Sequence, residues 1–68
     1  EMEVSSLKPG MVVRSRYETI LPRTITTVND FEVVYRVPAK HGGFFERRCL
    51  RVVWDRWCRA HSVCAEKQ

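Results

Sequence analysis

The spacing of hydrophobic positions along the chain changes once, near residue 50. Before that point, short runs alternate between apolar and polar residues or are rich in β-branched side chains, which is typical of strands. After it, apolar residues recur three and four positions apart, which is typical of one face of a helix. We therefore predict a single domain over residues 1–68, with strands within residues 7–49, a helix over residues 50–62 and a frayed tail over residues 63–68.

Four strands are predicted, over residues 11–17, 23–28, 31–37 and 44–49. The third has the clearest alternation, because one of its two faces is entirely apolar or aromatic: Phe31, Val33, Tyr35 and Val37. Asn29 and Asp30 separate it from the second strand, and both residue types tolerate positive φ. A tight two-residue hairpin is therefore expected at this point.

The predicted helix has one apolar stripe, formed by Leu50, Val53, Trp54, Trp57 and His61. The opposite side is polar, and there Asp55 lies four residues from both Arg51 and Arg59, so that it can form ion pairs along the solvent face. The two tryptophans would cover the open end or one face of the sheet. We expect the core to contain Val33, Tyr35, Val53, Trp54 and Trp57.

This order of elements predicts a mainly β fold class with a C-terminal helix: a small, four- to five-stranded antiparallel and partly open barrel capped by one amphipathic α-helix. The opening Leu7-Lys8-Pro9-Gly10, followed by Val13-Arg14 and later by a tight hairpin, resembles SH3-like small β-barrel domains over about residues 7–50. The resemblance implies the fold alone, because such barrels bind RNA, DNA or peptides and some are enzymes.

Length and cysteine content narrow the class further. A chain of 68 residues holds one core and buries only about 60% of its unfolded surface, so its stability should be marginal. Its three cysteines are an odd number confined to the last third, which fits reduced thiols better than a disulfide framework. The first residues lack the features of a signal peptide, and no apolar run approaches a membrane span. We expect a cytoplasmic protein that does not contact a membrane.

The charge of the chain favours an anionic partner. The net charge is +4, and nine of the twelve basic residues are arginines. Arginine has a planar fork that grips phosphate or carboxylate at two points and stacks on aromatic faces. An arginine-rich surface of solvated ion pairs would explain the same composition, so both interpretations stay open at this stage.

The preferred hypothesis is a small nucleic-acid-binding module with a regulatory role, which contacts phosphates of DNA or RNA through the sheet surface. Arg14 and Arg16 share a face of the first strand by alternation, whereas Arg47 and Arg48 point to opposite faces of the fourth. The candidate residues are Arg14, Arg16, Arg36, Lys40, His41, Arg47 and Arg48.

Two features decide between a nucleic-acid-binding surface and a surface of solvated ion pairs without a binding role. Tyr17 and one of Phe44 or Phe45 would stack on single-stranded bases if they are exposed, but they would serve the core if they are buried. Glu32 and Glu46 share faces with some of the arginines and would bind them in cross-strand ion pairs if the surface is merely solvated.

A protein-interaction adaptor or inhibitor is the competing class. Ile20 and Leu21 are apolar residues in a loop, where they would either form a contact for an acidic protein surface or a second copy, or fold back onto the barrel. A free sheet edge would also accept a strand from a partner, so a homodimer is possible.

Metal binding and catalysis have weaker support. The zinc candidates are Cys49, Cys58, His61 and Cys64. In a continuous helix, residues six apart lie about 9 Å apart along the axis. Two sulfurs on one zinc are at most ~4.6 Å apart, so we expect no metal and no cofactor. No nucleophile lies in a recognisable frame with a base and an acid, so we do not expect an enzyme.

Overall fold

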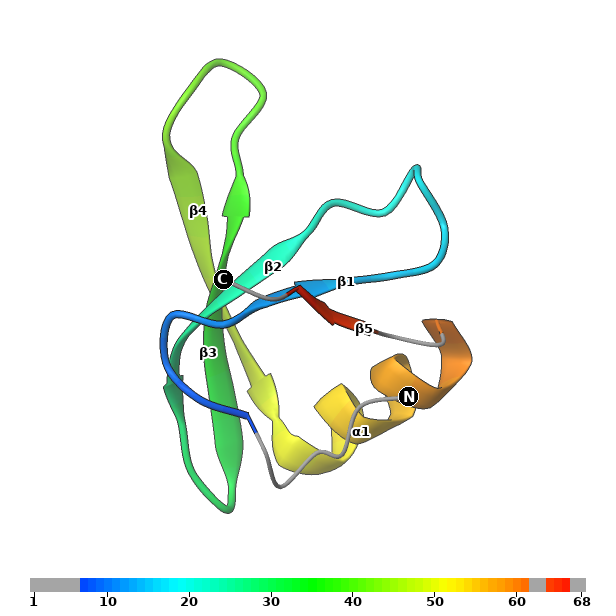
Figure 1. The fold of residues 1–68 in the computed structure, drawn as a ribbon. Helices are drawn as coiled ribbons and strands as arrows, with labels where there is room; N and C mark the ends of the chain where they lie inside the picture. The colour runs from blue at the N-terminus through cyan, green and yellow to red at the C-terminus, as the bar shows by residue number, and fades with distance from the viewer. Residues whose placement is uncertain (1–6, 62–63, 67–68) are drawn as a thin grey trace.

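The computed structural model describes residues 7–61 and 64–66 of the chain. Its elements are β1 (Val12–Arg14), β2 (Arg23–Val28), β3 (Glu32–Pro38), β4 (Phe44–Leu50), α1 (Arg51–His61) and β5 (Cys64–Glu66). The strands form one open antiparallel sheet in the order β4-β3-β2-β1-β5, with α1 against one face (Figure 1). The predicted fold class, mainly β with antiparallel strands and a helix near the C-terminus, is therefore confirmed, and the described strands form an open sheet where a partly open barrel was expected.

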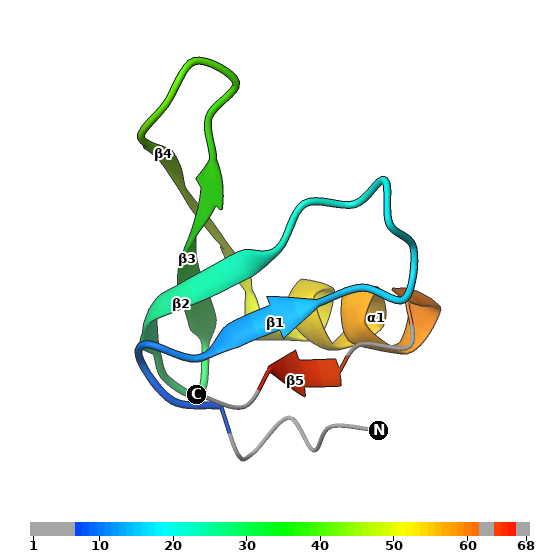
Figure 2. The same ribbon diagram turned by 45° about the horizontal axis from the view of Figure 1, so that its top comes forward.

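The last strand lies in the segment predicted to be a frayed tail. Residues 64–66 form β5 and pair with all three residues of β1, as Figure 2 shows from a second side. The expectation for these residues was wrong, because β1 leaves an edge whose backbone groups need partners. The remainder of the predicted tail lies outside the described residues.

The core lies between α1 and the face of the sheet that we call the inner face. Trp54 is completely buried there, and its ring lies 5.3 Å from that of Tyr35. The other buried members of this core are Leu7, Val13, Ile25, Val33 and Cys58, and Trp57 packs at its margin. The tryptophans therefore cover one face of the sheet, as the helical stripe predicts.

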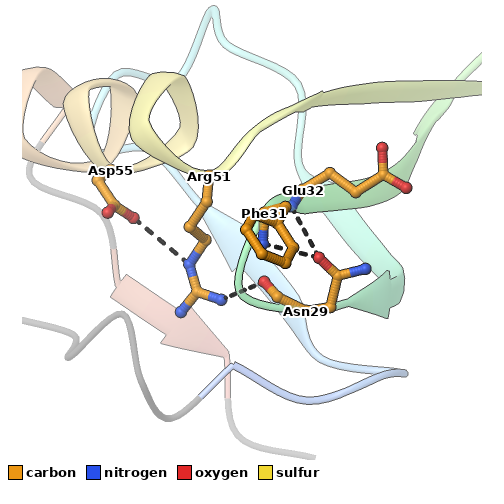
Figure 3. Close-up of polar contacts among 5 residues, drawn as sticks. All are labelled: Asn29, Phe31, Glu32, Arg51 and Asp55. Atoms are coloured by element: carbon orange, nitrogen blue, oxygen red, sulfur yellow. Dashed lines mark hydrogen bonds and ion pairs between the residues drawn. The ribbon is translucent and has the colours of Figure 1, made fainter.

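Val53 was also predicted in the core, but 44% of its surface is exposed. The helix is rotated toward Arg51 and Asp55, whose side chains are largely buried and form an ion pair of 3.7 Å (Figure 3). Arg51 also donates from Nη1 to the Asn29 carbonyl at 2.8 Å. Because successive helical residues are 100° apart, turning Arg51 inward turns Val53 outward.

The turn between β2 and β3 is longer than predicted. The Asn29 side-chain oxygen accepts hydrogen bonds from the backbone N–H groups of Phe31 and Glu32, at 2.8 and 2.9 Å (Figure 3). This Asx turn takes Phe31 out of the strand, and 79% of Phe31 is exposed. Phe31 therefore does not continue the apolar face of β3, although the alternation of the sequence predicted that it would.

Candidate nucleic-acid interface

The hairpin of β3 and β4 extends beyond the rest of the molecule, and we call its outer part, residues 36–48, the β3–β4 arm (Figure 1). The two strands pair without a bulge from Arg36 opposite Glu46 to Pro38 opposite Phe44. At the tip the Ala39 N–H donates to the Gly43 carbonyl at 3.0 Å, and Gly42 and Gly43 have positive φ of 99° and 73°. Glycine suits both positions, because other residues rarely adopt this conformation.

The β3–β4 arm concentrates the charge of the protein. It contains the basic residues Arg36, Lys40, Arg47 and Arg48 but a single acidic residue, Glu46, so its net charge is +3 against +4 for the whole chain. All residues from Lys40 to Arg48 are exposed, and so is Arg36. The basic side chains of this segment are accessible to solvent, so phosphates can reach them.

Two phenylalanines of the arm are exposed as well. Phe44 is 63% and Phe45 is 56% exposed, and as neighbours in β4 they point to opposite faces of the sheet. The guanidinium of Arg47 lies 5.8 Å from the centre of the Phe45 ring. Neither phenylalanine serves the core, so both faces of the arm present an aromatic ring for stacking.

The register distributes the basic residues of the arm over both faces. Arg48 lies opposite the buried Val34 and faces away from α1 with Arg36, whereas Arg47 lies opposite Tyr35 on the inner face. The prediction that Arg47 and Arg48 diverge is confirmed. Between residues that the structure describes, one ion pair involves the arm, Arg48 with Glu32 at 3.9 Å, and the Arg48 side chain is still 68% exposed. An exposed pair of this kind contributes only about 0–1 kcal/mol.

Arg14 and Arg16 lie outside the arm. Arg14 ends β1, which is separated from β3 by β2, a separation of about two strand spacings or ~9.5 Å. Arg16 lies in the following loop, where its N–H donates to the His61 carbonyl at 3.1 Å and its guanidinium lies 5.1 Å from the ring centre of Tyr17. The expected alternation of these two residues along one strand was wrong, because β1 ends at residue 14.

Arg23 is a prominent residue of the inner face that we did not single out from the sequence. Its guanidinium lies 3.7 Å from the ring centre of Trp57, 4.5 Å from that of Tyr35 and 5.4 Å from that of Trp54. Burial lowers the pKa of Arg23 below its usual value. The alternation of β2 could have predicted this position, because Arg23 lies on the same face of the strand as the buried Ile25.

The aromatic contacts continue from Arg23 toward the loop after β1. Trp57 lies 5.4 Å from Trp54 and 5.1 Å from His61, and His61 makes an edge contact of 5.7 Å with Tyr17. Tyr17 is 44% exposed, so this row of rings reaches the surface. It anchors the loop to the end of α1.

The thiols of Cys49 and Cys58 lie close to the core. Burial raises the pKa of Cys49 and raises that of Cys58 to about 11, so both thiols are protonated near neutral pH. Within the described residues, no three His, Cys, Asp or Glu side chains are grouped so as to hold a metal ion. The side chain of the fourth zinc candidate, Cys64, lies outside the described part.

The loop proposed for protein contacts is divided between the core and solvent. Ile20 is half-buried, and its N–H donates to the Tyr17 carbonyl at 3.0 Å. Leu21 is 53% exposed. Of these two apolar side chains, that of Leu21 is therefore the one accessible to a partner.

Comparison with protein-family models, with curated proteins and with solved structures finds no match for this chain. The similarity to SH3-like barrels therefore stays a prediction from the sequence pattern. In the described part of the chain, no helix is both long and apolar enough to cross a membrane.

Proposed function

We propose that this protein binds single-stranded nucleic acid through the β3–β4 arm. Arg36, Lys40, Arg47 and Arg48, with His41 at the tip, contact phosphates, and Phe44 and Phe45 stack on bases. The observation that carries the proposal is the combination of a net charge of +3 and two exposed phenylalanines on a thirteen-residue projecting hairpin.

The preference for a single strand rests on the aromatic rings. Base stacking on phenylalanine needs an unpaired base, and it adds about 1–3 kcal/mol per base with little dependence on sequence. The tryptophans of α1 face the sheet, so the helix has no free aromatic face for this purpose. Binding would depend on whether the nucleic acid is single-stranded and not on its base sequence. A regulatory role would follow from this preference for single strands.

The test is fluorescence anisotropy with labelled single-stranded RNA, single-stranded DNA and duplex DNA over a series of salt concentrations. Four phosphate contacts on a single strand give a slope of log K against log salt of about −3. Arg47→Gln should reduce this slope by about 0.7, whereas Arg56→Gln, an exposed position on α1 with the same loss of charge, should leave it unchanged.

Phe44→Ala combined with Phe45→Ala should weaken binding about tenfold or more without changing the slope, because stacking releases no counterions. Absence of binding at low salt to every nucleic acid, or equal effects of Arg47→Gln and Arg56→Gln, would contradict the proposal.

A protein partner at residues 20–21 is the second candidate, supported by the 53% exposure of Leu21. Substitution of Leu21 by Ser would then abolish capture of that partner while leaving nucleic-acid binding intact. Under either function, the free thiols of Cys49 and Cys58 suit a reducing compartment such as the cytoplasm.

A further inference from the structure

The free edge of β4 is the largest unpaired backbone surface among the described strands. β4 has β3 on one side and no described strand on the other, and its seven residues run without a bulge. Every residue of β4 except Cys49 is exposed. A long, regular edge strand is a template for another strand, and proteins usually protect it by shortening, bulging or covering it.

We propose that a second copy of this chain pairs with this edge, β4 against β4, in an antiparallel and symmetric dimer. The side chains of β4 are complementary to those of a second, antiparallel copy of the same strand. With Arg47 on the two-fold axis, Glu46 lies opposite Arg48 of the second copy, and Phe44 lies opposite Leu50 of the second copy. Symmetry repeats both contacts, so the interface has two ion pairs and two apolar pairs on the outer face.

The apolar contacts have a reason to form. Phe44 is 63% exposed and Leu50 is 61% exposed, although both belong to a regular strand. Pairing across the axis removes part of each side chain from water, and aromatic and aliphatic cross-strand neighbours stabilise a sheet by about 0.2–1 kcal/mol per pair.

The charges also select the register. A shift of the second copy by two residues puts either Glu46 or Arg48 directly opposite its own copy, and like charges in this position are repulsive. A shift by one residue would place inner-face side chains on the outer face. Among the registers that keep the two outer faces on the same side, the one centred on Arg47 pairs opposite charges.

In this register Arg47 faces its own copy on the inner face. Its guanidinium leans along its own strand toward Phe45, at 5.8 Å from the ring centre. Because the two strands run in opposite directions, the two guanidinium groups lean away from each other. The register places the two Arg47 residues opposite each other, and the lean of each guanidinium toward its own Phe45 increases the distance between the two charges.

Sedimentation velocity over a range of concentrations tests the proposal with charge variants. Glu46→Arg places two arginines opposite each other across the axis, and Arg48→Glu places two glutamates there. Each variant alone should dimerise about tenfold or more weakly than the unmodified chain. An equimolar mixture of the two should regain the affinity, because every pair in the mixed dimer then joins Arg to Glu.

The two variants have net charges of +6 and +2, so they repel each other overall. Attraction between their net charges therefore cannot explain a tighter mixed dimer. The matched controls are Glu18→Arg and Arg59→Glu, which make the same changes at exposed positions away from β4. Each control should dimerise like the unmodified chain, and mixing the two should have no effect.

Three results would overturn the proposal: a monomer at concentrations up to about 1 mM, a dimer that neither β4 variant weakens, or a mixture of these variants no tighter than each alone. The inference does not rest on nucleic-acid binding, because every measurement is made on the protein by itself.

Discussion

At the scale of single residues, Arg23 shows how a charged side chain is kept beside a small core. Half-burying a guanidinium costs free energy, because the charge loses part of its hydration. Arg23 is compensated by the faces of Tyr35, Trp54 and Trp57, which are all within 5.4 Å of it. Arginine suits this position because its planar group is weakly hydrated and can stack, which the ammonium of lysine does less well.

Arg23→Lys should therefore destabilise the protein although the charge is retained. We expect a loss of at most about 1–2 kcal/mol in the free energy of unfolding, since a partly desolvated cation–π contact contributes about this much and lysine keeps part of it. Urea unfolding followed by tryptophan fluorescence measures it. The matched control, Arg56→Lys on the exposed side of α1, should stay within about 0.5 kcal/mol of the unmodified chain. Equal unfolding midpoints for Arg23→Lys and its control would show that the stacking contributes nothing.

At the scale of elements, the β2–β3 turn and the start of α1 form one structural unit. α1 follows β4 directly, with no acidic residue in its first turn and no intervening cap residue. The missing cap is replaced from the turn, because the Arg51 N–H donates to the Phe31 carbonyl at 2.7 Å. The Arg51 side chain also donates to the Asn29 carbonyl (Figure 3). The turn therefore holds both the backbone and the side chain of the first helical residue.

Asn29→Ala should loosen this unit. It removes the acceptor of two backbone hydrogen bonds, and at about 0.5–1.5 kcal/mol each the expected loss is about 1–2 kcal/mol after allowance for their exposure. Asn29→Asp keeps the acceptor oxygen and should unfold close to the unmodified chain. Thermal unfolding by circular dichroism distinguishes the two, and an alanine variant as stable as the aspartate variant would rule out the proposed role of the turn.

The sequence predicted most elements because their patterns are local. The predicted ends of β2, β3, β4 and α1 agree with the structure to within one residue. β1 was predicted too long, because its end depends on a distant contact, the bond from Arg16 to His61. β5 was missed for the same reason, since it exists by pairing with β1 across about 50 residues of chain.

The candidate site was predictable only in part. The exposed basic and aromatic residues of the arm follow from a short run of sequence, whereas their separation from Arg14 depends on the order of the strands. The outward position of Val53 could not be read from helical periodicity, because the partners of Arg51 set the rotation of α1.

At the scale of the whole molecule, charge and stability are located in different parts. The arm has a net charge of +3, and the rest of the chain has +1. The core, by contrast, lies between α1 and the part of the sheet outside the arm. The arm therefore contributes exposed side chains and few buried ones. Substitutions at the exposed positions of the arm therefore leave the core contacts unchanged. Those within residues 44–48 act on both proposed surfaces, because the arm contains most of β4.

The proposed dimer adds a consequence for folding. A domain of this size buries only about 60% of its unfolded surface and is marginally stable by itself. Association of folded copies stabilises the folded state by mass action, so the unfolding midpoint of the unmodified chain should rise with protein concentration. Glu46→Arg alone should lose this concentration dependence, and the equimolar mixture with Arg48→Glu should recover it.

The informative quantity is the dependence on concentration rather than the midpoint itself. Glu46→Arg also places an arginine opposite Arg36 within one chain, which lowers the midpoint equally at every concentration. Differential scanning fluorimetry over a hundredfold range of concentration separates the two effects, because repulsion within the chain shifts the curve and loss of the dimer flattens it. An unmodified chain whose midpoint is constant over this range would mean that the outer edge of β4 does not pair with a second copy and that the monomer alone accounts for the stability.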